Sequence, residues 1–237
     1  MNDTGLRALL DSPLFTLVLT LAVFEGCLWL YRRSRLLPLL HPTIIGAIVL
    51  ALLLPRLDLD YATYQRGTVW LELLLGPATV ALAIPLYRQL ALIRALALPI
   101  LLTAVVGCAV GSLSALGLAW LFDGNLETLR SLAAKSVTTP IAIGITQELG
   151  GLVTLATGAV MITAAIGISL APLVFRLLRV TDPRIQGFAL GVVSHGMGTA
   201  RAFERSQIGG AFASLALCLM GILSAAAIPT AFLLLAR

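Results

Sequence analysis

The sequence predicts an all-α integral membrane protein with about seven or eight transmembrane segments. Hydrophobic residues make up 59% of its 237 residues and charged residues only 11%, whereas a soluble domain carries about 25% charged residues. Apolar runs such as 92–122 and 152–178 exceed the roughly 20 residues that a helix needs to cross a bilayer. Because every polar stretch is too short to fold by itself, we expect residues 1–237 to form a single polytopic membrane domain.

Eight apolar segments follow one another along the chain. They lie at roughly 14–31, 36–54, 70–88, 92–122, 131–149, 152–178, 186–203 and 210–235. The turns between them hold most of the arginines, and the positive-inside rule places the basic turn 32–35 in the cytoplasm. The net charge of +5 is therefore a signal of topology and predicts no nucleic-acid partner. The N-terminus lacks the features of a secretory signal, so we expect a bacterial inner-membrane protein that is complete as written.

A proline divides the fifth apolar segment. Pro140 has no amide hydrogen and disfavours helical geometry at Thr139, so a continuous helix would cost about 3 kcal/mol or more. A full crossing here would also put the arginines within 176–184 outside, against the positive-inside rule. If part of 131–151 enters the membrane and turns back, those arginines return to the cytoplasm. We expect such a re-entrant segment, and a plain crossing with misplaced arginines is the alternative.

The same segment predicts an anion site. A helix that begins at Pro140 with Thr139 as its N-cap would start inside the membrane, and its free amide groups would carry partial positive charge. The hydroxyl groups of Ser136 and Thr138 add hydrogen-bond donors. Irregular polar backbone at membrane depth is tolerated only when it is buried in protein or lines a cavity. We therefore expect a small carboxylate to bind here; a proline kink whose hydroxyls bond their own helix is the alternative.

Gly76 and Pro77 predict a second half-helix start, with Thr79 in its first turn. The stretch 76–85 resembles 139–146, and a long apolar run follows each of them. Transporters often carry such interrupted segments in corresponding halves, with the breaks at the binding site. We expect the two starts to face each other across an inverted repeat. Chance similarity within an apolar alphabet is the alternative.

The glycine-rich stretch 187–204 is the second group of candidate residues. Its small residues recur four apart at Gly187 and Gly191, and Ser194, Gly198 and Ala202 continue the spacing on a neighbouring stripe. Small residues at this spacing let membrane helices approach closely. We expect this stretch to pack tightly against another helix.

His195 and Thr199 lie four apart in that stretch and would share one helix face. A histidine deep in an apolar segment is costly unless it is paired, so it is a functional candidate by default. A single structural hydrogen bond is the alternative. Arg201 either reaches a substrate carboxylate or pairs with Glu204, three residues further on.

Three titratable side chains are candidates for proton coupling. Glu25 lies within the first apolar segment, Glu148 lies near the end of the expected half-helix, and His195 carries an imidazole that titrates near neutral pH. A neutral packed carboxyl group at Glu25 and a position of Glu148 at the membrane interface are the alternatives.

Enzymatic activity, a metal site and a cofactor are not predicted. Adjacent Ser194 and His195 do not by themselves build a nucleophile and base, and a third partner is missing. The histidines and acids show no zinc spacing, and neither a phosphate loop nor a dinucleotide fingerprint occurs.

Three motifs resemble those of the LrgB family. They are Leu75-Gly-Pro-Ala-Thr-Val-Ala-Leu-Ala-Ile-Pro-Leu-Tyr87, Lys135-Ser-Val-Thr-Thr-Pro140 with the following Gly150-Gly151, and Ser194-His-Gly-Met-Gly-Thr-Ala200 with Glu204. The resemblance covers nearly the whole chain, with the motifs in the family's order. The LrgB family includes CidB-type bacterial proteins and the plastid glycolate/glycerate translocator. The family was long described as holin-like or antiholin-like modulators of murein hydrolases, and several members carry small carboxylates.

The resemblance implies a function and a partner. It places the candidate residues in signature motifs without assigning their roles, and it implies a small LrgA-type membrane protein as partner. We expect a secondary carrier of carboxylates of the pyruvate, glycolate and glycerate class, with proton coupling and a homo-oligomer left open. A pore or a regulator of murein hydrolase export and cell lysis is the alternative.

Overall fold

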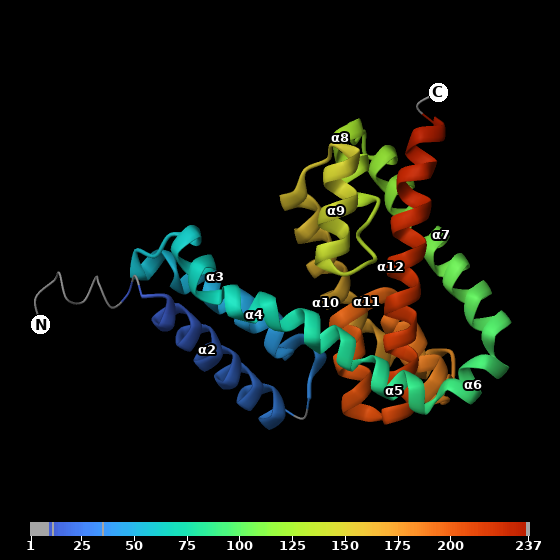
Figure 1. Ribbon diagram of the computed structural model, residues 1–237, viewed down its shortest axis with the longest axis horizontal. Helices are drawn as coiled ribbons and strands as arrows, with labels where there is room; N and C mark the ends of the chain where they lie inside the picture. The colour runs from blue at the N-terminus through green and yellow to red at the C-terminus, as the bar shows by residue number, and fades with distance from the viewer. Residues whose placement is uncertain (1–9, 11, 35, 236–237) are drawn as a thin grey trace, which may run out of the picture. The chain divides into compact units, whose positions relative to one another are not determined.

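The computed structural model describes residues 10, 12–34 and 36–235, without the side chains of Leu39, Leu75, Thr79 and Leu235. All regular structure within these residues is helical, which confirms the predicted all-α class. In chain order (Figure 1) the elements are α2 (Pro13–Arg33), η1 (Pro38–Leu40), α3 (Pro42–Leu53), η2 (Pro55–Leu57), α4 (Tyr61–Ala81), α5 (Ala83–Arg88), α6 (Leu90–Ala95), α7 (Ala97–Leu121), α8 (Leu126–Leu132), α9 (Thr139–Leu149), α10 (Val153–Leu177), α11 (Pro183–Arg205) and α12 (Gln207–Leu235).

Five helices in the described part of the chain are long and apolar enough to cross a membrane. They are Pro13–Arg33, Tyr61–Arg88, Ala97–Leu121, Val153–Leu177 and Gln207–Leu234. Large apolar side chains such as Leu113, Trp120 and Leu177 are exposed on their surfaces. The three remaining apolar segments are the short helix α3 and two segments that are broken. The expected seven or eight full crossings stay a prediction.

The chain groups into two compact units, Met1–Ala81 and Leu82–Arg237. The first unit holds α2, α3 and α4, and the second holds α5 to α12. The expected single domain over residues 1–237 therefore stays a prediction.

In the first unit, α2 packs against both α3 and α4. Gly67 of α4 lies against the first turn of α2, where a Cβ atom would come within 1.7 Å of Thr16 Oγ1. One turn further along α2, Thr20 Oγ1 donates a hydrogen bond of 3.1 Å to the hydroxyl oxygen of Tyr64. The pairing runs in opposite directions along the two helices, so α2 and α4 are antiparallel.

Helix α4 runs through Pro77 without a break, so the predicted half-helix start at Gly76 and Pro77 is wrong. A proline ring clashes with the Cβ and the amide of the preceding residue, and Gly76 has no Cβ atom. Membrane helices also tolerate the carbonyl group that a proline leaves without its partner. The stretches 76–85 and 139–146 therefore fold differently, and the expected pair of proline breaks does not occur.

Residues 131–151 form a hairpin that returns to the place where it began. The chain leaves α8, passes through the non-helical stretch 133–138 and comes back along α9 (Figure 1). The amide of Leu152 donates a hydrogen bond of 2.7 Å to Ser131 Oγ, which joins the two ends of the hairpin. Gly150 ends α9 in the left-handed conformation, with φ 72°. This return confirms the expected turning back of the fifth apolar segment.

The element α11 forms a second hairpin, which consists of two helical arms. The chain breaks between the two arms at His195, and not at a proline. His195 has φ 37° and ψ −116°, which no helix contains. The chain doubles back there, because a Cβ atom at Gly198 would lie 2.1 Å from the carbonyl oxygen of Leu190. The ends of the hairpin also meet, since a Cβ atom at Gly209 would lie 3.1 Å from the carbonyl oxygen of Pro183. The expectation that His195 and Thr199 share one face of a helix is therefore wrong.

The tips of both hairpins lie beside the middle turns of long helices. Ser136 in the first tip lies against Gly111 of α7, and Ser194 in the second lies against Gly167 of α10, where added Cβ atoms would come within 3.0 and 2.1 Å of the serine hydroxyls. Both helices have 25 residues and are about 37 Å long. Both tips therefore lie near half the depth of the membrane that α7 and α10 would span.

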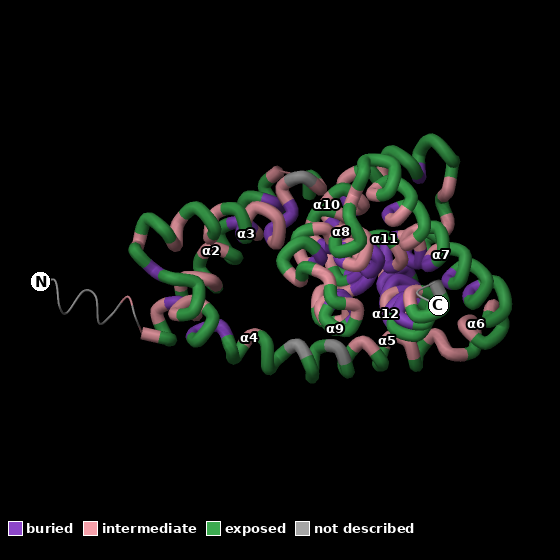
Figure 2. The backbone as a smooth tube through the Cα atoms, turned by 90° about the horizontal axis from the view of Figure 1, so that it is seen from above, coloured by how far each residue is buried: buried purple, intermediate pink, exposed green. Residues whose placement is uncertain are grey.

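Close packing holds the second hairpin against α12. A Cβ atom at Gly187 would lie 2.0 Å from the carbonyl oxygen of Gly209, and one at Gly191 would lie 2.2 Å from that of Ala213. This contact confirms the predicted tight packing of the small residues. The first hairpin packs through an apolar cluster against α10 and α12. Buried residues accordingly gather around α9, α11 and α12 (Figure 2).

Candidate functional site

The tips of the two hairpins bring His195 and Lys135 together. The imidazole lies close enough to the backbone and to the ammonium group of Lys135 for both to act on its charge. His195 is buried, with 5% of its surface exposed, and Lys135 is half-buried. Lys135 Nζ donates a hydrogen bond of 3.4 Å to Ser136 Oγ. An ammonium group, an imidazole and a hydroxyl group thus meet where the two chain breaks touch.

Two buried polar atoms at the second tip have no hydrogen-bond partner within the described residues. They are Ser194 Oγ and His195 Nε2, and Thr146 Oγ1 on α9 is a third such atom. Leaving a buried polar group unpaired costs about 1–3 kcal/mol, and native structures pair nearly all such groups with protein, water or a ligand. The tip of the second hairpin therefore offers hydrogen bonds to a polar molecule.

The backbone of His195 adopts a conformation that favours glycine. A positive φ at a residue with a side chain costs on the order of 1–3 kcal/mol and persists only where the surroundings impose it. Here Thr199 Oγ1 donates a hydrogen bond of 2.8 Å to the carbonyl oxygen of His195 and fixes the orientation of that peptide group. His195 and Thr199 are thus coupled through the backbone at the break, and not by sharing a helix face.

Helix α9 begins a few residues after Lys135. Its N-cap is Thr138, so the N-cap expected at Thr139 is wrong by one residue. Thr138 makes no side-chain cap hydrogen bond, and the first turn contains Pro140, which has no amide hydrogen. Thr138 and Thr139 are half-buried and Pro140 is exposed. The start of α9 therefore presents amide groups that no side chain caps, next to the positive charge of Lys135.

The other predicted polar residues lie away from the tips. Arg201 Nη1 lies 2.6 Å from Glu204 Oε2 on the returning arm of α11. This ion pair is the predicted alternative to a contact between Arg201 and a substrate. Glu148 is exposed in the last turn of α9, at the base of the first hairpin, and Glu25 is exposed on α2. A role of Arg201 in substrate binding stays a prediction. So does a role of Glu25 and Glu148 in proton coupling.

The structure brings together two of the three predicted groups. Lys135, directly before Ser136, meets His195 in the second unit, where Gly198 gives room for the returning arm of α11. Gly76 and Pro77 are exposed on α4 in the first unit, and the side chain of Thr79 lies outside the described residues. The expected facing of this group with 136–140 stays a prediction.

Sequence reasoning missed Lys135 as a site residue. It is the only lysine among the 16 basic residues of the chain. A charged residue inside an apolar segment is a functional candidate by default, so this signal was present. It was passed over because the half-helix ends were expected to supply all of the positive charge.

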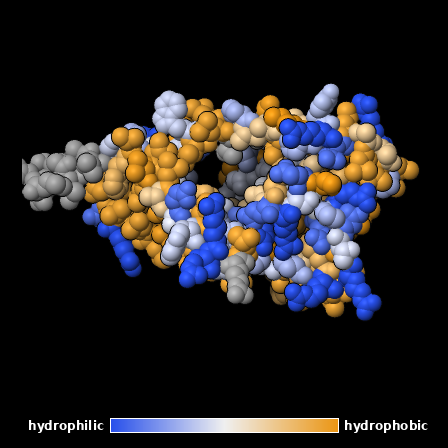
Figure 3. Space-filling view, turned by 90° about the horizontal axis from the view of Figure 1, so that it is seen from below, coloured by the Kyte–Doolittle hydropathy of each residue, from blue (hydrophilic) through white to orange (hydrophobic). Residues whose placement is uncertain are grey.

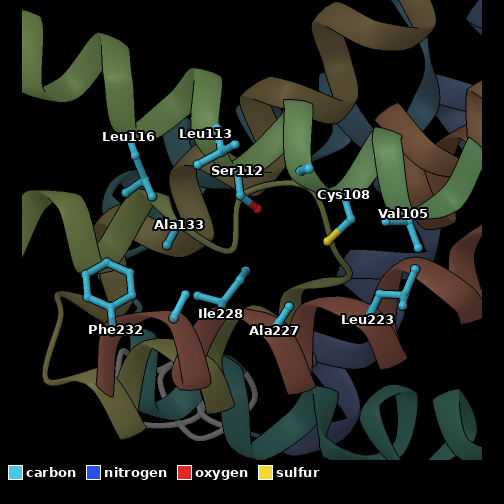
Figure 4. Close-up of a pocket in the computed structure, with 12 residues that line it drawn as sticks. Val105, Cys108, Ser112, Leu113, Leu116, Ala133, Leu223, Ala227, Ile228 and Phe232 are labelled. Atoms are coloured by element: carbon cyan, nitrogen blue, oxygen red, sulfur yellow. The ribbon is translucent and has the colours of Figure 1, made fainter. Parts of the chain in front are cut away.

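A separate cavity of about 260 Å³ opens between α7 and α12 (Figure 4). Its walls are mostly apolar, with Val105 and Leu116 on one side and Ile228 and Phe232 on the other. A carboxylate would lose its hydration there without gaining a partner. This cavity suits a hydrocarbon chain, and the polar tips remain the candidate site.

Comparison with known proteins gives relatives along most of the chain. The uncharacterized protein YxaC of Bacillus subtilis (strain 168) is 37% identical over 207 residues, which cover 87% of this chain and 90% of that protein. YwbG of the same organism is 35% identical over 217 residues, covering 90% and 95%. The antiholin-like protein LrgB of Bacillus cereus (strain B4264) is 28% identical over 218 residues, covering 92% and 95%. No solved structure matches the chain.

The family match agrees with the motifs and with the fold. The LrgB-like family matches residues 20–234, a range that includes both hairpins and all five candidate spans in part or in full. The apolar helices and this match make the chain a multi-pass membrane protein, and the resemblance carried by the three motifs is confirmed. The chain belongs to the LrgB family.

Proposed function

We propose that this LrgB-family protein carries small carboxylates of the pyruvate, glycolate and glycerate class across the bacterial inner membrane. The observation that carries the proposal is the meeting of Lys135 and His195 at the tips of two hairpins. Secondary transporters bind their substrates near half depth, where broken helices expose amide groups and carbonyl groups. A simple pore has no need of two broken segments whose tips touch.

The charge of Lys135 supports an anionic substrate. Within the described residues Lys135 forms no ion pair, and the pairs Arg184–Asp182 and Arg201–Glu204 join other residues. A cation at membrane depth is costly unless it is paired. A carboxylate supplies the missing negative charge, and the Ser136 hydroxyl and the first amide groups of α9 add hydrogen-bond donors for its oxygens.

His195 supports recognition of a hydroxyl or keto group beside the carboxylate. Its Nε2 atom is buried and has no partner within the described residues, so it can accept a hydrogen bond when neutral or donate one when protonated. In a proton-coupled cycle, a proton on His195 would enter with the anion and leave with it.

A small LrgA-type membrane protein is the partner that the family suggests, and assembly into homo-oligomers is compatible with the exposed apolar surface. Neither is needed for the two hairpin tips to meet, because both tips come from one chain. The proposal therefore predicts that the isolated chain binds carboxylates, whether or not the partner is required for turnover.

Uptake by the purified full chain in proteoliposomes tests the proposal. We expect saturable uptake of radiolabelled pyruvate, glycolate or glycerate, and we expect Lys135→Gln to abolish it. Arg130→Gln is the matched control, because it removes one positive charge from α8 near the base of the same hairpin. Absence of uptake of any two- to four-carbon acid, with and without the small partner, would overturn the proposal.

A second candidate is an antiholin-like pore or a regulator of murein hydrolase export and lysis. The name of the Bacillus cereus relative, antiholin-like protein LrgB, favours this function over transport. It predicts that vesicles carrying the protein release a trapped fluorescent dye and show little selectivity. The carrier predicts that the dye stays inside while carboxylate uptake proceeds, so one vesicle preparation decides between the two.

A further inference from the structure

A cavity of about 460 Å³ at the end of α10 is lined by three arginines. Arg176 lies in the last turn of α10, Arg179 in the turn that follows it, and Arg205 at the end of α11. Gln186 adds a polar side chain and Phe175 an apolar one. The lining contains no acidic residue. The cavity is therefore positively charged.

The acids nearest to this cavity in the chain are already engaged. Asp182 forms an ion pair with Arg184, and Glu204 forms one with Arg201. Neither of these two arginines lines the cavity. Within the described residues Arg176 and Arg179 form no ion pair, so their charges are left for a ligand.

Hydrogen bonds fix the turn that carries Arg179. The amide of Val180 donates a hydrogen bond of 2.9 Å to the carbonyl oxygen of Phe175, and Gln186 Nε2 donates one of 2.7 Å to the carbonyl oxygen of Val180. Arg179 itself has φ 54°, a conformation that glycine usually supplies after a helix. The guanidinium group of Arg179 thus extends from an ordered turn.

The cavity lies where two spanning helices reach the edge of the membrane. Helix α10 ends at Leu177, and α12 begins at Gln207, directly after Arg205. Both are candidate spans, so their ends lie at the level of the lipid headgroups. Figure 3 looks from below onto a surface where hydrophilic side chains lie among apolar ones. The positive-inside rule places this arginine-rich end in the cytoplasm.

We propose that this cavity binds the phosphate group of an anionic phospholipid from the cytoplasmic leaflet. Two guanidinium groups can each hold a phosphate through paired hydrogen bonds. Pro172 and Phe175 supply an apolar wall for the glycerol and the start of the acyl chains. Basic pockets between membrane helices recognise lipid headgroups in this way. This lipid site is separate from the carboxylate site at the hairpin tips, and either can exist without the other.

Lipid retention by the purified full chain tests the proposal. We expect native mass spectrometry of protein from mixed phosphatidylglycerol and phosphatidylcholine micelles to show bound phosphatidylglycerol in preference. Arg176→Gln combined with Arg179→Gln should weaken retention about thirtyfold, from the usual contribution of each basic residue near an anionic lipid. Arg88→Gln combined with Arg94→Gln is the matched control, since it removes two charges from α5 and α6 and should leave retention unchanged.

Two further measurements keep the outcome clear. Arg176→Lys combined with Arg179→Lys keeps the charge and should retain part of the phosphatidylglycerol, which separates lost binding from lost folding. Inorganic phosphate should raise the melting temperature far less than phosphatidylglycerol does. Equal loss of lipid in the two double glutamine variants would overturn the proposal. So would stabilisation by inorganic phosphate alone, because the site would then take a soluble ion.

Discussion

The amide of Leu152 donates a hydrogen bond of 2.7 Å to the hydroxyl oxygen of Ser131, 21 residues earlier in the chain. This bond closes the base of the first hairpin. Ser131 is held in turn, because its hydroxyl donates a bond of 2.6 Å to the carbonyl oxygen of Glu127 on α8. One side chain thus ties the entry of the hairpin to its exit and sets the level to which α9 returns.

Replacing Ser131 with alanine should therefore lower stability by about 1–3 kcal/mol, because the amide of Leu152 would lose its acceptor. The measurement is the melting temperature of the purified chain in detergent. Ser114→Ala is the control, since that hydroxyl bonds only a carbonyl of its own helix and is exposed. A melting temperature that falls equally in both variants would contradict the closing role of Ser131.

At His195 we predict that glycine stabilises the fold more than alanine does, which is the reverse of their usual order in a helix. In a helix interior alanine is more stable than glycine by about 1 kcal/mol. At His195 the φ of 37° reverses this order, because glycine reaches that conformation freely. His195→Gly should melt at a higher temperature than His195→Ala, while both lose carboxylate uptake with the imidazole. If His195→Ala is the more stable variant, α11 is not broken at this residue.

Asp182 gives a prediction for the dependence of stability on pH. Its carboxylate accepts hydrogen bonds from the guanidinium and the backbone amide of Arg184, which lower the pKa of Asp182 below its ordinary value of 3.8. A lowered pKa stabilises the folded state above the unfolded pKa, and this contribution is lost as the pH falls through the folded value.

Comparison with Asp182→Asn isolates that charge, because asparagine is an equally good N-cap. The wild type should melt at a higher temperature at neutral pH, and the difference should shrink below about pH 4. Because the pair is partly exposed, added salt should reduce the difference as well. A difference that is the same at neutral and at acid pH would contradict this assignment.

The sequence predicted one hairpin and missed the other, for a physical reason. At Pro140 two signals agreed, since a proline disfavours a continuous helix and the charges of the following turn favoured a return of the chain. At Pro77 only the proline was present, and Gly76, which has no Cβ atom, lessens the clash with the proline ring. Helices α10 and α12 likewise run through Pro172 and Pro229, which follow Ala171 and Ile228, so a proline alone does not predict a break in a membrane helix.

The break at His195 has no comparable local signal. Glycines at 196 and 198 permit a turn, but glycines four apart also serve close helix packing, which is what Gly187 and Gly191 do in the same element. What imposes the turn is tertiary contact, because Gly167 of α10 lies against Ser194 and the returning arm packs along α12. Such contacts between distant segments could not be seen in one sequence.

Lys135 allows a direct chemical test of the site. Because it is the only lysine of the chain, an amine-selective reagent can modify Lys135 and the N-terminal amine alone. Lys135 is half-buried and its ammonium group lies beside Ser136 and His195. If a carboxylate pairs with it, bound substrate should shield the amine, so pyruvate or glycolate should slow its acylation while a neutral analogue such as ethylene glycol should not.

The labelling experiment carries its own control within each molecule. Peptide mass spectrometry reports acylation at the N-terminus and at Lys135 separately, and only the second should respond to the carboxylate. Lys135→Arg should keep part of the uptake because the charge remains, although a guanidinium has a different shape and set of donors. Lys135→Met should keep none. Acylation of Lys135 at an unchanged rate in the presence of every carboxylate tested would remove the ammonium group from the binding site, even if the protein transports these acids.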